Sequence, residues 1–168
     1  LIERHPGSRG GLWLVYDFAT TSGDQNIFEN PQGPHSALYG QKPFKPDEIR
    51  AIYVLPNGFY AFALYDAAGN RIDRVLPGIE KPYAGVEADA VEPTTKTGVK
   101  CFACHSDGLV EAKDDFKTAF DASAPLSPSR ATALRLFGTD SENTLLLIGS
   151  RDRYHLAVRS VGIDPNAR

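Results

Sequence analysis

The residues best suited to chemistry are two cysteines and a histidine in the run Cys101-Phe102-Ala103-Cys104-His105. The chain has 168 residues and contains no other cysteine. Two thiols three positions apart can reach the two vinyl groups on one edge of a porphyrin, and the next imidazole can then bind the iron from one face. The spacing therefore predicts one covalently bound haem c, attached through Cys101 and Cys104, with His105 as an axial iron ligand.

Three other uses of the motif fit the surrounding sequence less well. A thioredoxin-like redox pair belongs to a βαβ setting, and no alternating strand–helix pattern surrounds the motif. A zinc centre needs a second pair of ligands, whereas the other histidines, His5, His35 and His155, are scattered singly. A disulfide between the two cysteines would leave His105 unexplained. We therefore favour haem attachment.

The second axial ligand of the iron has several candidates. Methionine, a common choice, is absent from the chain. His155, in a stretch predicted to be helical, is our first candidate for the sixth position, although a single histidine is more often a surface residue than a ligand. His35, His5, a lysine such as Lys113 and a tyrosine are alternatives. An open sixth position would instead admit NO, CO or peroxide.

The elements that must position this motif are predicted to form an α+β fold. Residues 1–48 are rich in Gly, Pro, Asn and Asp, and within them only 12–16 is a short apolar run, compatible with a strand or one helical turn. Three strands are predicted at 49–55, 59–65 and 71–76, joined by tight turns into an antiparallel meander. The second of these strands is apolar on both faces, so we expect it to be central and most buried.

Behind the motif the pattern becomes helical. The predicted helices cover 111–120, a segment starting at Ser127, a segment capped by Thr139 or Asp140 that runs through Ile148, and 150–161. The last of these would place Tyr154, Ala157 and Val161 on one stripe. We expect a single domain over 1–168, with a β-rich lobe at 1–100 and the haem motif with its helical tail at 101–168.

Composition excludes some classes of function. The chain is 42% hydrophobic and 23% charged, as in globular proteins, and its 18 basic and 21 acidic residues give a net charge of −3. Nucleic-acid binding, which usually needs a basic excess, is not expected. No apolar run is long enough to cross a membrane. A chain without methionine lacks a translational start, so we expect a processed or excised piece, exported to the periplasm or anchored to a membrane outside this fragment.

Short phrases around the motif resemble a family of bacterial monohaem c-type cytochrome domains. These phrases are Tyr16-Asp17-Phe18, Gln25-Asn26-Ile27-Phe28, Leu55-Pro56-Asn57-Gly58-Phe59, the run from Asp66 to Asp73, and the run from Cys101 to Leu109. The resemblance covers residues 13–110 and implies one covalent haem and export from the cytoplasm. A fainter resemblance links the chain to the cytochrome P460 and c′-β group, which is β-rich ahead of a late C-x-x-C-H and has five-coordinate iron.

The expected function is electron transfer with a partner or parent oxidoreductase, without substrate chemistry. Covalent haem in a small domain fits this function best. The alternative is a haem protein with an open or labile sixth position that binds NO or CO or reduces peroxide, which the missing methionine favours.

Overall fold

The computed structural model contains one antiparallel sheet of five strands in the order β1-β2-β3-β4-β5. The strands are β1 (Ile2–Gly7), β2 (Gly10–Asp17), β3 (Glu48–Val54), β4 (Tyr60–Asp66) and β5 (Arg71–Ile72). The structure describes residues 1–8, 10–19, 25–27, 30, 33–34, 44–76, 79, 97–111, 116, 131, 133, 135–137 and 139–165. The predicted α+β class is confirmed, because strands that are consecutive in the sequence are neighbours in the sheet and the helices follow them in the chain.

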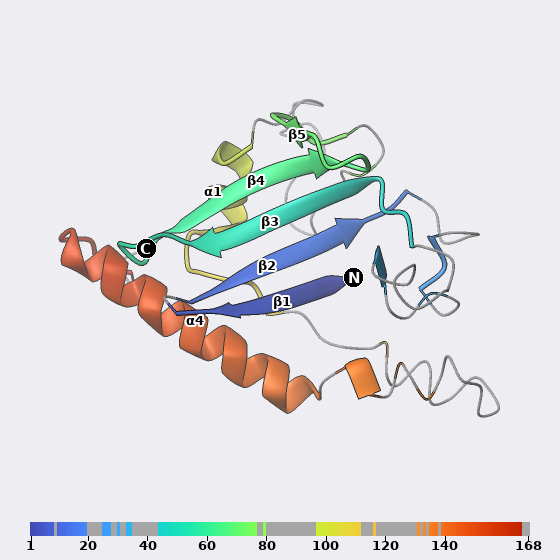
Figure 1. Cartoon of the computed structure of the whole chain (residues 1–168). Coiled ribbons are helices and arrows are strands. Elements are labelled where there is room, and N and C mark those ends of the chain that lie inside the picture. Colours follow the sequence, from blue (N-terminus) through green and yellow to red (C-terminus); the bar gives the residue numbers. More distant parts are fainter. Residues whose placement is uncertain are drawn as a thin grey trace.

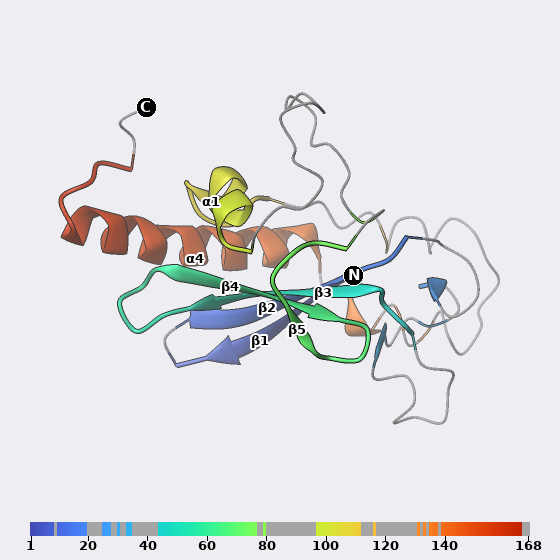
Figure 2. The ribbon, with the colours of Figure 1, turned by 90° about the horizontal axis from the view of Figure 1, so that it is seen from above.

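Two described helices, α1 (Val99–His105) and α4 (Asp140–Ser160), lie on the same side of the sheet. Figure 1 shows α4 running diagonally across one end of the strands, with α1 behind β4. In the perpendicular view both helices lie above the sheet (Figure 2). The segment Cys101–His105 on α1 thus lies on the helix-covered face.

The core lies between this face and α4. Strand side chains alternate, so Ile52 of β3 shares a face with its β4 partner Phe62 and with Tyr60 two positions earlier. The Tyr60 ring stacks on Tyr154 of α4 with centroids 4.8 Å apart, and its hydroxyl shares a 2.8 Å hydrogen bond with Ser150. The remaining residues of this cluster are Val158, Trp13, Val54, Phe59 and Leu109.

The predicted hairpin between β3 and β4 is confirmed. Gly58 has φ 87°, which favours glycine, and its amide donates to Leu55 O at 2.9 Å. The Asn57 side chain accepts from the amide of Phe59 at 3.2 Å, closing the turn. The turn also approaches α4, because a Cβ added at Gly58 would lie 2.8 Å from the Cβ of Ala157.

The sheet extends further toward the N-terminus than the sequence indicated. The run 12–16 is a strand, within β2, and β1 was not predicted at all. These strands add to one side of β3, so β3 is the middle strand of the five. Within the predicted meander, the strand expected at 59–65 does lie in the centre, as β4 between β3 and β5. The third predicted strand, 71–76, shrinks to the two residues of β5, because only Arg71 and Ile72 find partners on β4.

The predicted break between two C-terminal helices is also wrong. A single helix, α4, runs through Gly149 and Ser150, since a glycine inside a long helix costs only about 1 kcal/mol. Thr139, one of the two cap residues predicted, begins it and forms a capping box with Glu142. Tyr154 and Ala157 are buried as expected, but Val161 lies past the helix end and is 57% exposed; Val158 is buried instead.

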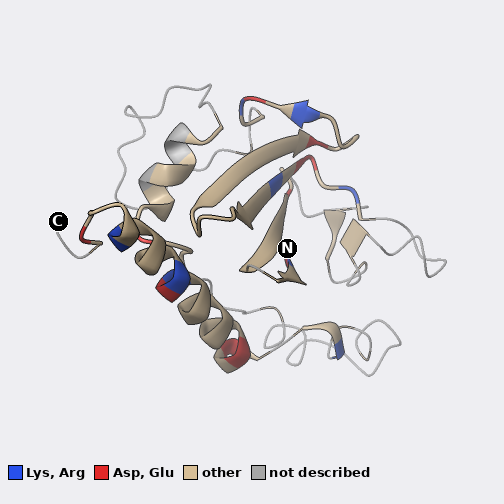
Figure 3. Cartoon of the chain, turned by 60° about the vertical axis from the view of Figure 1, so that its left-hand side comes forward, with Lys and Arg blue, Asp and Glu red and all other residues tan. Residues whose placement is uncertain are grey.

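The charges on α4 follow its dipole. Acidic Asp140 and Glu142 occupy the first turn and basic Arg159 the last (Figure 3), which is the favourable arrangement.

The helix predicted at 111–120 lies outside the described residues except for positions 111 and 116, and the start predicted at Ser127 lies outside them.

Candidate functional site

The two cysteines of the motif lie on the short helix α1. Cys101 and Cys104, three positions apart, share one face of this helix. Both are free thiols of intermediate exposure, so in this structure they are not joined to each other. The start of α1 is tied to the sheet, because the amide of Thr97 donates to Asp73 O at 2.9 Å, just beyond β5. Both thiols are therefore accessible and presented from an anchored helix.

His105 is the last residue of α1, and its surroundings set the state of its ring. Its Nδ1 lies 3.1 Å from the carbonyl oxygen of Gly108. A carbonyl can only accept, which assigns the ring proton to Nδ1 and leaves a lone pair on Nε2. Burial lowers the pKa of His105, and the bond to Gly108 opposes this shift only in part. A neutral imidazole with a free Nε2 is the form that binds iron.

Aromatic rings separate this helix from the sheet. Phe62 of β4 packs edge-on against Phe102, with centroids 5.0 Å apart, and lies 5.7 Å from the ring of His105. Two other aromatic residues are engaged elsewhere: Tyr60 belongs to the α4 core, and Phe116 packs on Phe137 with centroids 4.2 Å apart. Phe62 and Phe102 are thus the described aromatic residues that border the motif.

His155 lies in α4, mostly buried, beside the loop that follows His105. Its Nε2 is 2.9 Å from Asp107 Oδ1, and Arg151 Nη2 donates to Asp107 Oδ2 at 2.8 Å. The structure therefore connects His155 to the motif through a carboxylate. Sequence reasoning missed Asp107 and Gly108, although an Asp-Gly pair one residue beyond the motif is a turn signal.

Of the other ligand candidates, His5 is the one that the structure describes, and it does not lie at the motif. His5 of β1 lies 3.0 Å from Glu3, on the same strand. His35 and Lys113 fall outside the described residues. Of the four ligand candidates named by residue, the described part of the chain brings only His155 close to the motif.

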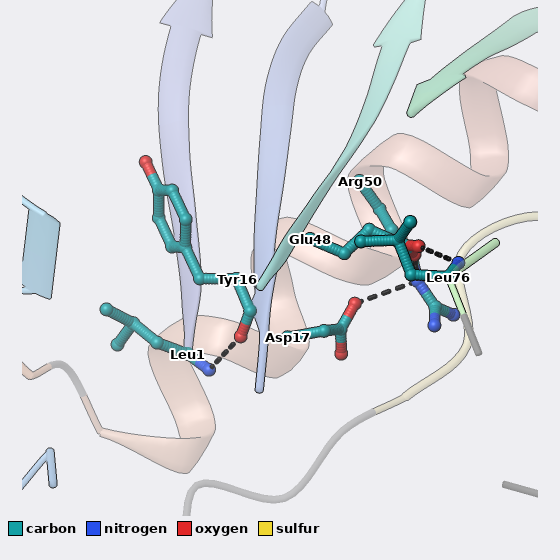
Figure 4. A network of polar contacts seen from close by, with 6 residues as sticks. All are labelled: Leu1, Tyr16, Asp17, Glu48, Arg50 and Leu76. Atoms are coloured by element: carbon teal, nitrogen blue, oxygen red, sulfur yellow. Dashed lines mark hydrogen bonds and ion pairs between the residues drawn. The ribbon is translucent and has the colours of Figure 1, made fainter. Parts of the chain in front are cut away.

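A cluster of charges around the buried Glu48 occupies the face of the sheet that carries Ile52, at the end of the strands away from the β3–β4 turn (Figure 4). Glu48 is fully buried; its two oxygens accept from Arg50 Nε at 3.1 Å and from the amide of Leu76 at 2.7 Å. Asp17 Oδ2 lies 2.8 Å from the same Nε. Since that one N–H is donated to Glu48, Asp17 gains charge attraction without the hydrogen bond, and burial raises its pKa.

The described residues form no other candidate centre. Within them, no group of three or more His, Cys, Asp or Glu side chains converges as a metal site would require. None of the helices described is both long and apolar enough to cross a bilayer, in agreement with the expectation from the sequence. No protein-family model, characterised protein or solved structure matches the chain. The chemistry of the site must therefore be argued from its own residues.

Proposed function

We propose that the protein is a c-type cytochrome that carries one covalent haem and transfers electrons to or from a partner protein. The observation that carries the proposal is the motif on α1, in which His105 directs Nδ1 to a carbonyl and keeps Nε2 for iron. The haem, when bound, supplies an iron centre that exchanges single electrons. The proposal includes export, since thioether attachment takes place outside the cytoplasm.

The residues of α1 fit this group in three respects. The thiols of Cys101 and Cys104 are free and share a helix face, as attachment to one porphyrin edge requires. Burial favours the neutral form of His105 by lowering its pKa, and the Gly108 carbonyl favours the proton on Nδ1. Phe62 and Phe102 provide apolar surface beside the imidazole, which limits water near the ligand.

The test is intact mass and spectroscopy of protein matured by a cytochrome c assembly system. We expect a mass increase of one haem that survives denaturation, and its loss when both Cys101 and Cys104 are replaced by Ala. His105→Ala should alter the visible spectrum of any haem that remains attached. A matured wild-type protein with bare mass and two freely alkylated thiols would refute the proposal.

A second candidate function is a haem protein with an open sixth position that binds NO or CO or reduces peroxide. It is favoured by the placement of the histidines: the Nε2 atoms of His155 and His5 both face carboxylates, and methionine is absent. A visible spectrum of the reduced protein, with and without CO, separates the two. A sharp low-spin band unaffected by CO supports the electron carrier, whereas a broad spectrum that shifts with CO supports the open site.

A further inference from the structure

The loop that follows the motif contacts α4 through charged side chains. Asp107 receives Arg151 Nη2 at 2.8 Å on one carboxylate oxygen and His155 Nε2 at 2.9 Å on the other. Arg151 and His155 are four positions apart on α4, so they present their donors from one side of the helix. A single carboxylate thus links α4 to the turn beside His105, although the paired residues are 44 and 48 positions apart in the sequence.

Close packing adds to this fastening. Gly108 is buried, has φ 108°, and a Cβ at this position would lie 3.2 Å from Arg151 Cγ. The backbone of the loop therefore lies directly on the stem of the same arginine that binds Asp107. Together these contacts fix the carbonyl of Gly108 between α4 and the ring of His105.

We propose that Asp107, held by Arg151 and His155, is a positioning residue that keeps the Gly108 carbonyl on Nδ1 of His105. The order of contacts is α4, Asp107, Gly108 and then the imidazole. We call this set, Asp107 with Arg151 and His155, the carboxylate clamp. It gives His155 a role other than axial ligand. The inference rests on the proposed function, because its purpose is to orient and tune an iron ligand.

The clamp should affect the reduction potential of the haem in a direction that can be predicted. A firm hydrogen bond from Nδ1 to a carbonyl makes the imidazole a stronger electron donor, which favours ferric iron. Loosening the clamp should weaken that bond and raise the potential. It should also change the imidazole orientation, which is visible in the pattern of haem methyl shifts in the paramagnetic NMR spectrum.

The decisive variant is Arg151→Gln in the haem-loaded protein, because its effect on charge and its effect on the position of His105 shift the reduction potential in opposite directions. Loss of a nearby positive charge alone would lower the potential, whereas a loosened His105 would raise it. We expect a higher potential and a rearranged methyl pattern. Asp107→Asn should change the methyl pattern in the same manner. The control for Asp107→Asn is Asp152→Asn, which removes one negative charge from an exposed residue of α4. It should leave the methyl pattern unchanged.

His155 is tested by a matched pair. His155→Gln keeps a donor that can reach Asp107 and should retain most of the wild-type methyl pattern, whereas His155→Leu should resemble Asp107→Asn. A change from low-spin to high-spin iron in both variants would identify His155 as the sixth ligand and overturn its positioning role.

Failure of the clamp and failure of the proposed function have different signatures. If wild-type protein carries no haem after maturation, the proposed function fails and the inference falls with it. If haem is attached, but Arg151→Gln lowers or preserves the potential with unchanged methyl shifts, only the clamp is overturned. A lower melting temperature with unchanged potential and methyl pattern would mean that the clamp merely stabilises the fold, which also overturns the inference.

Discussion

At the scale of single residues, two histidines of this chain are held by different partners. His105 faces a carbonyl oxygen, which accepts one proton and leaves the other ring nitrogen basic. His155 faces a carboxylate, which holds its Nε2 in place. The partner of each ring, more than the residue type, decides which nitrogen remains for a metal.

The buried hydroxyl of Tyr60 allows a first prediction. Tyr60→Phe keeps the stack on Tyr154 but removes the 2.8 Å hydrogen bond to Ser150, whose side chain is buried. We expect a loss of about 1 kcal/mol in the free energy of unfolding, measured by urea denaturation. Adding Ser150→Ala should cost less in the Tyr60→Phe background than in wild type. Equal costs in the two backgrounds would show that the two hydroxyls are not coupled.

The charge cluster at Asp17 predicts a dependence of stability on pH. Burial raises the pKa of Asp17 in the folded chain, with Arg50 opposing the shift, so the folded state binds this proton more tightly than the unfolded chain does. The stability that Asp17 contributes is therefore lost as pH rises from its unfolded pKa, about 3.9, through its folded pKa. Asp17→Asn removes this loss. Urea denaturation over this range should show the free energy of unfolding of the variant rising relative to that of wild type as pH increases. A difference between the two free energies that stays constant with pH would contradict the prediction.

At the scale of elements, the β3–β4 hairpin packs on α4 through a glycine, and a matched pair of variants isolates that packing. Gly58 and Gly69 have similar positive φ angles, 87° and 81°. A Cβ at Gly69 would meet nothing within 4 Å, whereas one at Gly58 would lie 2.8 Å from Ala157. Gly69→Ala should cost about 1 kcal/mol from backbone strain, and Gly58→Ala about 1 to 3 kcal/mol more from overpacking.

Thermal and urea unfolding of both glycine variants measure this difference. The Ala157→Gly background supplies the control, because removing the opposing methyl should relieve part of the penalty of Gly58→Ala and none of that of Gly69→Ala. Equal penalties for the two glycines would mean that the hairpin tip does not press on α4.

The sequence predicted those elements whose signals are local. The β3–β4 hairpin has a Pro-Asn-Gly turn between two apolar runs, and the start of α4 has a threonine of the type that caps helices. In contrast, β1 carries Arg4, His5 and Pro6, and nothing in its own pattern indicates a strand. It is a strand because β2 offers it a partner, and such pairing is tertiary information. The same holds for α4, whose glycine at 149 is tolerated because the helix packs on the sheet.

The candidate site divides in the same way. The motif of Cys101, Cys104 and His105 is contiguous, so the hypothesis of haem attachment follows from spacing alone. The contacts of Asp107 with Arg151 and His155 join positions 44 to 48 apart. No spacing rule predicts them, because they exist only once α4 has packed across the sheet.

At the scale of the whole molecule, the buried residues of the core and the residues of the Cys101–His105 motif are different sets. The cluster that joins the sheet to α4 is formed by Ile52, Tyr60, Tyr154 and Val158 and includes neither cysteine nor His105. Leu109, directly after the motif loop, is the member of that cluster closest to α1 in sequence. The sheet and α4 therefore supply all the buried residues of this cluster, and the motif meets it at Phe62, which packs on Phe102.

This separation predicts that the chain folds without its cofactor. The double variant Cys101→Ala, Cys104→Ala, which cannot be loaded, should keep the far-ultraviolet circular dichroism of the sheet and α4 and unfold in one cooperative transition. Its midpoint should fall below that of the loaded protein, because the apolar surface beside Phe62 and Phe102 then faces water. Near-ultraviolet circular dichroism of the stacked Tyr60 and Tyr154 reports the core directly. If that signal and the cooperative transition disappear together, the haem is part of the core, and the fold depends on maturation rather than preceding it.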